Sequence, residues 1–265
     1  MPGKPPISEK DMRQALAEGQ FSVAYQPQVL ADGSKIASVE ALVRWTHPQH
    51  GSIPPVDFIP VAEKSGLIKE LGAFVLRRAC QDAVQWPSLT VGVNVSPYQF
   101  RDPSFVDFVR SAAEEAGLPL QRLELEITEG SYFDDFKSAE IAIERLRSLG
   151  VGIALDDFGT GYASLTYLRR LPLTKVKIDK SFVDEFQSLG SSAIIQAVVA
   201  LSRALGLKVT AEGVETIEQQ RFLRAAGCHY LQGYLFSLPV GADGITELLA
   251  RPVHMPVPLP AAPGR

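Results

Sequence analysis

Seven short apolar runs of this chain end in polar side chains that could bind a metal ion or a phosphate group. The runs are rich in Val, Ile and Leu, and their length is typical of buried strands. Their endings supply Glu40 and Arg44, Asn94, Glu126 and Glu129, Asp156 and Asp157, Lys177 and Asp179, Glu212 and Glu215, and Gln232. If the strands share one barrel, the endings converge on one face that carries far more negative than positive charge. Because crowded carboxylates repel one another, we expect divalent metal to supply the counter-charge.

The types of these side chains predict which metal ion binds. Carboxylate and carboxamide oxygens, as in Glu40, Asn94 and Glu126, suit Mg²⁺ or Mn²⁺. Zinc would favour His and Cys, and the four histidines have no ligand spacing. Neighbours on a regular strand point to opposite faces, but at a strand end Asp156 and Asp157 can both face one cavity. One carboxylate could then bridge two cations about 3.5–4 Å apart, an arrangement used for in-line attack on phosphodiesters.

Each of these residues, taken alone, has an ordinary structural interpretation. The Asp156-Asp157 pair could cap a helix that begins near Gly161. Lys177 could be an edge lysine, and Arg44 could neutralise Glu40. Solubility alone does not explain polar endings on seven of eight predicted strands. We therefore predict a metal or phosphate site at the carboxyl ends of the strands, where barrels of this kind have their active sites.

The segments between the runs predict an alternation of helices and strands. A short helix ends at Gly19, and the Asp32-Gly33 turn between the first two runs predicts an antiparallel hairpin. Afterwards a unit of helix, glycine and strand recurs, as the crossovers between parallel strands require. We predict strands at about 21–29, 36–45, 90–96, 122–128, 151–157, 174–179, 208–213 and 230–236. The expected fold is α/β, a (β/α)8 TIM-like barrel with an antiparallel first strand, and a doubly wound open sheet is the alternative.

Length, composition and charge narrow the class of protein. With 265 residues and 46% hydrophobic content, the chain can form one large domain, which we place at 8–251 between a disordered flank (1–7) and a flexible Pro/Ala-rich tail (252–265). The net charge of −4 offers no basic surface for duplex nucleic acid. No signal peptide or membrane-inserting segment is evident, which favours a cytoplasmic protein or cytoplasmic domain. Cys80 and Cys228 are expected to be core thiols, with a disulfide as the lesser alternative.

Nine motifs in register resemble the EAL-domain family, phosphodiesterases of the bacterial messenger cyclic di-GMP. The resemblance covers roughly residues 8–240. The motifs are YQP (25–27), EALVRW (40–45), FIPVAE (58–63), NVSP (94–97), EITE (126–129), DDFGTGYASL (156–165), KIDKSFV (177–183), AEGVET (211–216) and QGYLFS (232–237). The departures are small: Ser38 stands where many members have Gly, YASL replaces the usual YSSL, and Gly130-Ser131 is slightly unusual. None of them removes a metal-binding acid or the lysine.

The resemblance implies a role for each site residue. Two ions, Mg²⁺ or Mn²⁺, would be held by Glu40, Asn94, Glu126, Asp156, Asp157 and Asp179, with Asp156 and Asp157 serving the second ion. Ca²⁺ is expected to inhibit. Lys177 would contact the attacking water, as a base or as an electrostatic guide, and Glu212 and Gln232 would position waters at the metal. Substrate phosphate would be held by Arg44, Gln26 and the Leu42 backbone, and Glu129 and Glu215 would brace the loops.

The resemblance implies hydrolysis of cyclic di-GMP to linear pGpG. It also implies a homodimer, formed through helices beside the loop 156–162, and fused or associated regulatory modules. A catalytically silent receptor of the same fold is the main alternative. A two-carboxylate glycosidase is another, although the many acids and the presence of only two tryptophans, Trp45 and Trp86, argue against it.

Overall fold

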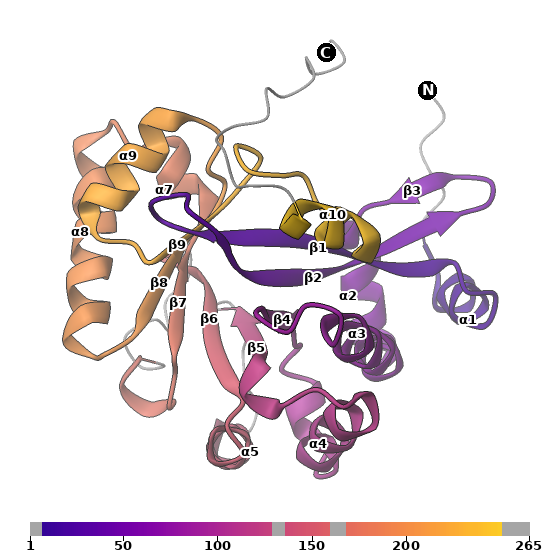
Figure 1. The fold of residues 1–265 in the computed structure, drawn as a ribbon. Coiled ribbons are helices and arrows are strands. Elements are labelled where there is room, and N and C mark those ends of the chain that lie inside the picture. Colours follow the sequence, from indigo (N-terminus) through magenta and orange to yellow (C-terminus); the bar gives the residue numbers. More distant parts are fainter. Residues whose placement is uncertain (1–6, 129–135, 160–167, 251–265) are drawn as a thin grey trace.

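The computed structural model describes residues 7–128, 136–159 and 168–250. Its central strands close into a barrel (Figure 1), because the first of them pairs with the second as well as with the last. The barrel strands are β1 (Phe21–Leu30), β2 (Ile36–His47), β4 (Thr90–Asn94), β5 (Leu123–Thr128), β6 (Gly152–Phe158), β7 (Lys175–Ile178), β8 (Lys208–Ala211) and β9 (Tyr230–Gln232). Strand β1 pairs antiparallel with both β2 and β9 and so closes the barrel, while the pairs from β2 through β4 to β9 are parallel. The predicted barrel with an antiparallel first strand is confirmed, and the open sheet is excluded.

Two features of the strands differ from the sequence-based prediction. A ninth strand, β3 (Gly51–Ile53), pairs with the end of β2 outside the barrel. The last barrel strand ends at Gln232 instead of continuing to residue 236. The next residue, Gly233, lies against the Val214 backbone, where a Cβ atom would come within 2.1 Å of the Val214 carbonyl oxygen, so a side chain does not fit there.

Helices cover the outside of the barrel. They are α1 (Glu9–Ala17), α2 (Pro55–Ser65), α3 (Ile68–Ala83), α4 (Phe105–Ala116), α5 (Phe136–Ser148), α7 (Lys180–Asp184), α8 (Leu189–Ala204), α9 (Ile217–Ala226) and α10 (Ala242–Ala250), with short 3₁₀ turns at Gln99–Arg101 and Leu120–Arg122. Several ends follow from local sequence. Ser8 and Thr216 form capping boxes at the starts of α1 and α9, and the predicted glycines Gly117 and Gly227 end α4 and α9 in the left-handed conformation.

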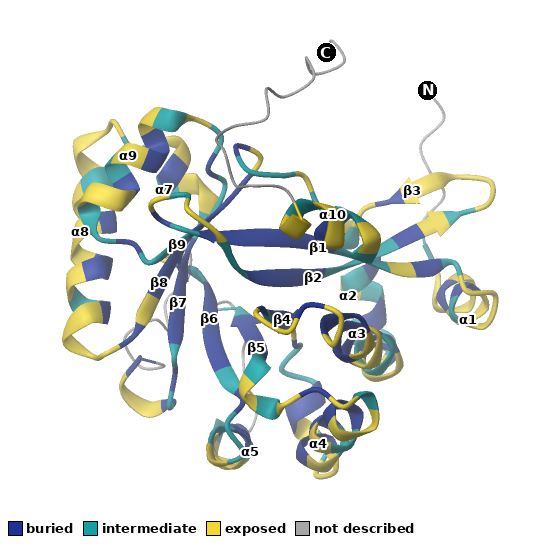
Figure 2. Ribbon diagram, in the orientation of Figure 1, coloured by how far each residue is buried: buried dark blue, intermediate teal, exposed yellow. Residues whose placement is uncertain are grey.

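Most residues of the barrel strands are buried (Figure 2). The helix-facing and interior sides of the barrel differ in chemistry. Val, Ile and Leu side chains of the strands pack against the helices in one large apolar core. The interior of the barrel instead contains buried Glu, Asp, Lys and Gln side chains, where barrels of this class usually hold branched apolar residues. A separate small core around Trp45 and Phe58 supports the far end of β2. The fold therefore uses its helix-facing core for stability and leaves the interior for polar chemistry.

Cys80 and Cys228 are both free and buried, as predicted. Across the described ranges, no helix combines the length and apolar character needed to cross a membrane. The expected N-terminal flank and the Pro/Ala-rich tail lie almost wholly outside the described residues.

Candidate active site

Lys177 lies at the centre of the barrel mouth, with its ammonium group among four carboxylates. Its Nζ is 3.0 Å from Asp156 Oδ2 and 3.3 Å from Glu40 Oε2. It is 2.6 Å from Glu212 Oε1 and donates a short hydrogen bond to Glu126 Oε2. The Lys177 side chain is fully buried, so the edge-lysine alternative is wrong. Acids carried by β2, β5 and β6 and by the residue that follows β8 therefore share one buried cation.

The chain geometry at Asp157 brings two adjacent carboxylates into one cavity. The pairing of β6 with β7 shifts register between Leu155 and Phe158. Asp157 has φ 54°, which makes it the one non-glycine residue with a positive φ in the described part of the chain. Oxygens of Asp156, Asp157 and Glu212 consequently lie within 4.8 Å of one another. The expectation that both aspartates face the same cavity is confirmed, while the helix expected near Gly161 lies outside the described residues.

The carboxylates form two groups that fit divalent metal ions. Glu40, Glu126 and Asp156 form the first group, whose oxygens also lie within 4.8 Å of one another, and Asp156 belongs to both groups. Within the described ranges, the buried Glu126 Oε1 has no hydrogen-bond partner, so this oxygen remains available to a cation. Asn94 holds the first group by donating from Nδ2 to Glu40 Oε1 at 2.7 Å. This all-oxygen donor set suits a hard cation such as Mg²⁺ or Mn²⁺.

The pKa values of the centre reflect this crowding. Burial, followed by the neighbouring charges of Glu40 and Asp156, raises the pKa of Glu126 well above its ordinary value despite the attraction of Lys177. Burial and the charges of Asp156 and Asp179 raise the pKa of Asp157 to about 6. Burial alone would lower the pKa of Lys177, but the surrounding carboxylates raise it well above its usual range. The surrounding carboxylates therefore favour the protonated form of Lys177.

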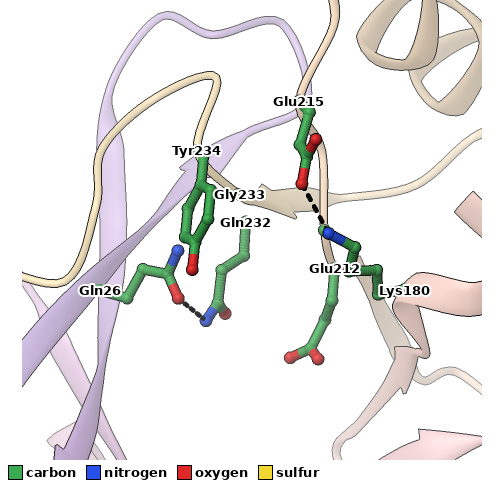
Figure 3. Close-up of a pocket in the computed structure, with 8 residues that line it drawn as sticks. Gln26, Lys180, Glu212, Glu215, Gln232, Gly233 and Tyr234 are labelled. Carbon is green, nitrogen blue, oxygen red and sulfur yellow. Dashed lines mark hydrogen bonds and ion pairs between the residues drawn. The ribbon is translucent and has the colours of Figure 1, made fainter. Parts of the chain in front are cut away.

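A pocket of about 170 Å³ opens beside this centre (Figure 3). Its wall includes Gln26, Glu212, Gln232 and Tyr234. Gln232 donates from Nε2 to Glu40 Oε2 at 2.7 Å and to Gln26 Oε1 at 3.1 Å, which places its amide between the acids and the pocket. At the rim, Lys180 and Glu215 form an ion pair of 2.5 Å. A larger pocket of about 300 Å³ on the other side of the mouth is lined by residues that include Leu42, Asn94 and Pro97.

Comparison with known proteins identifies the family. The sequence profile of the EAL domain matches residues 9–239. The chain belongs to the EAL domain family. It is 45% identical over 246 residues to the bifunctional diguanylate cyclase/cyclic di-GMP phosphodiesterase MucR of Pseudomonas aeruginosa, covering 91% of this chain and 36% of MucR. It is 48% identical over 239 residues to an uncharacterized signaling protein of Caulobacter vibrioides, covering 89% of this chain and 30% of that protein. The chain thus spans about a third of the length of these relatives.

Solved EAL structures share the barrel described above. The structure of the PaMucR phosphodiesterase in complex with c-di-GMP superposes with a TM-score of 0.85 at 45% identity, covering 89% of this chain and 98% of that one. The EAL enzyme Bd1971, in its cAMP and cyclic-di-GMP bound form, gives a TM-score of 0.87 at 33% identity, covering 91% and 68%.

The EAL site residues predicted from sequence fall into four sets. Leu42 lines the larger pocket and Glu215 pairs with Lys180 at the rim, and their assigned roles stay predictions. The barrel mouth brings together Glu40, Asn94, Glu126, Asp156, Asp157, Lys177, Glu212, Gln232 and Gln26. Arg44 is half-buried and donates to the Val43 carbonyl at 2.9 Å. Asp179 caps α7 by accepting from the Ser181 N–H at 3.0 Å. The roles assigned to Arg44 and Asp179 stay predictions. Glu129 lies outside the described residues.

Gly92, a residue not predicted from sequence, shapes this EAL site. Gly92 lies beside Glu40, on the neighbouring parallel strand β4. A Cβ atom at Gly92 would come within 2.1 Å of Glu126 Oε1. Glycine is needed here for space, not for an unusual backbone angle, because its φ is not positive. A glycine among strand residues is a sequence signal for such close approach.

Gly92→Ala is therefore expected to displace the Glu126 carboxylate and weaken divalent-metal binding while the fold persists. Gly190→Ala is the matched control, since a Cβ there meets no atom within 4 Å. Calorimetric titration of Mn²⁺ into both variants checks the expectation. Equal Mn²⁺ affinity in the two variants would show that Glu126 does not hold the ion.

Proposed function

We propose that this EAL domain is a divalent-metal-dependent phosphodiesterase that hydrolyses cyclic di-GMP to linear pGpG. The observation that carries the proposal is the pair of carboxylate groups that share Asp156 around one buried lysine. Relatives support the substrate: NbdA of Pseudomonas aeruginosa, 46% identical over 248 residues, is named a cyclic di-GMP phosphodiesterase. We place two ions at the two groups, with Asn94 as a further ligand of the first ion and Asp179 supporting the second.

Metal ions bound at these groups would polarise the scissile phosphodiester and activate water for attack. The chain's own residues would then orient the reactants. Lys177 is assigned to contact the attacking water, to which its ammonium would offer a hydrogen bond and a fixed positive charge. Glu212 and Gln232 are assigned to positioning waters at the metal ions.

Substrate contacts are assigned to residues at the rim of the mouth. Gln26 lines the pocket beside Gln232, where its amide can bind a phosphate or a base edge. The half-buried Arg44 and the Leu42 backbone lie on β2, beyond Glu40, and are assigned to phosphate. Glu129 and Glu215 are assigned to bracing the adjacent loops.

A silent cyclic di-GMP receptor of the same fold is the second candidate. The intact acidic centre favours the enzyme, because a receptor has no need to keep crowded carboxylates in a buried site. We further propose that the chain works as a homodimer in the cytoplasm, joined to regulatory modules as its longer relatives suggest.

Incubation with cyclic di-GMP and Mg²⁺, Mn²⁺ or Ca²⁺, followed by nucleotide separation, tests the proposal. Mg²⁺ and Mn²⁺ are expected to yield pGpG, whereas Ca²⁺, with longer bonds and higher coordination, is expected to permit binding and suppress hydrolysis. Binding of cyclic di-GMP without turnover in any metal would favour the receptor. Robust turnover with Ca²⁺ alone would contradict the assigned metal choice.

A further inference from the structure

A second polar layer lies inside the barrel, directly beneath the acidic centre. Ser38, Glu124 and Lys175 each precede a residue of the centre by two positions, so they point to the same face of their strands. Gln28 stands in register with Gln232 on the neighbouring strand. The exposed fractions of Ser38, Glu124, Lys175 and Gln28 are 5%, 6%, 5% and 1%. None of the four has a role in the proposed reaction.

Hydrogen bonds connect this layer to a residue of the metal site. Lys175 Nζ is 2.6 Å from Glu124 Oε1 and donates to Gln28 Oε1 at 3.4 Å. Ser38 Oγ donates to the same Gln28 oxygen at 2.7 Å. Gln28 Nε2 donates to Gln232 Oε1 at 2.9 Å, and Gln232 Nε2 donates to Glu40 Oε2 at 2.7 Å. A continuous chain of contacts therefore runs from a buried ion pair to the Glu40 carboxylate.

The donors and acceptors of these groups fix the direction of every hydrogen bond in the series from Lys175 to Glu40. A lysine ammonium can only donate, so Gln28 must turn its carbonyl oxygen toward Lys175. The Gln28 amide N–H₂ then faces Gln232, which must accept this hydrogen bond with its side-chain oxygen. Gln232 is left with its N–H₂ toward Glu40, which is the orientation that a carboxylate requires. The ammonium of Lys175 thus sets the orientation of both amides.

A buried lysine–glutamate pair is an expensive way to fill the interior of a barrel. Apolar residues of similar volume would often be equally stable or more stable there. The pair is therefore better explained by what it orients than by stability. We propose that Gln28, held by Lys175 and Ser38, is a positioning residue that fixes the Gln232 amide and, through it, the Glu40 carboxylate for divalent-metal binding. Its catalytic consequence rests on the proposed function, but its effect on metal affinity does not.

Two substitutions at Gln28 separate positioning from electrostatics. Gln28→Met keeps the volume and removes both hydrogen-bonding ends of the amide. Gln28→Glu keeps an acceptor for Lys175 but turns a second acceptor toward Gln232, so the Gln232 amide flips and its oxygen faces Glu40. A negative charge added near a cation site would by itself strengthen Mn²⁺ binding. The flipped Gln232 amide would instead weaken Mn²⁺ binding, so the two effects predict opposite changes in Mn²⁺ affinity for Gln28→Glu. Gln220→Met, at a buried glutamine on α9, is the matched control.

Calorimetric titration with Mn²⁺, on variants whose folding is verified by urea denaturation, decides the matter. We expect Gln28→Met and Gln28→Glu each to weaken Mn²⁺ affinity by about 10- to 100-fold, as loss of a residue behind a metal ligand commonly does. Gln220→Met is expected to bind like wild type. Wild-type Mn²⁺ affinity in either folded Gln28 variant, or no Mn²⁺ binding by wild type, would overturn the positioning role. If wild type binds Mn²⁺ without hydrolysing cyclic di-GMP, the proposed function alone fails.

Discussion

Replacing Lys177 by Met is expected to make the folded state depend on a divalent ion. Lys177 contacts Glu40, Glu126, Asp156 and Glu212, and its loss leaves these acids with no cation at their centre among the described residues. Removing one partner of a buried ion pair destabilises a protein by about 3–5 kcal/mol. A divalent ion that binds only the folded state restores about 2.7 kcal/mol at a hundredfold excess over its Kd. Turnover is expected to be lost, because the donor to the attacking water is gone.

Urea denaturation of Lys177→Met, in chelator and in Mn²⁺, measures this effect. The matched control is Lys180→Met, which removes an exposed ion pair with Glu215 and is expected to change the free energy of unfolding by less than about 1 kcal/mol. The Mn²⁺-induced increase in stability should be larger for Lys177→Met than for wild type. A chelated Lys177→Met protein as stable as chelated wild type would show that the carboxylates do not need a counter-charge.

Asp156→Asn is expected to abolish hydrolysis and to reduce the stabilisation by Mn²⁺. Asp156 is shared by both carboxylate groups, so one substitution weakens both candidate ion sites. The change removes a negative charge from a crowded site with little change in shape. The metal-free variant should therefore be as stable as wild type or more stable. Differential scanning fluorimetry in chelator and in Mn²⁺ measures both effects, and a chelated variant that melts well below chelated wild type would assign Asp156 a structural role.

The sequence allows the barrel and most of the acidic centre to be predicted. The Asp32-Gly33 turn between two apolar runs predicts the hairpin that the structure contains. Glycines after helices, such as Gly117 and Gly227, mark the crossovers of the parallel strands. Because parallel strands end at the same edge of the sheet, Glu40, Asn94, Glu126 and Asp156 were expected to meet there, and they do.

The remaining features depend on register between strands far apart in sequence. Lys175 and Glu124 look like ordinary strand residues until closure of the barrel brings them within 2.6 Å of each other. The central position of Lys177 and the space required at Gly92 follow from the same register. The left-handed backbone at Asp157 has no specific sequence signal, since aspartate visits this conformation only occasionally and its residue type does not say where. The second polar layer is indicated in the sequence only by spacing, since Ser38, Glu124 and Lys175 each lie two residues before a residue of the acidic centre.

Metal reconstitution of the wild-type protein tests the central claim most directly. The protein is stripped with chelator, returned to defined free Mn²⁺ concentrations, and assayed for bound Mn²⁺ and for hydrolysis of cyclic di-GMP in the same samples. We expect no hydrolysis in chelator and a rise in pGpG that follows occupancy of the two carboxylate groups. Hydrolysis that persists in chelator, or full Mn²⁺ occupancy without any pGpG, would contradict a metal-dependent phosphodiesterase at this centre.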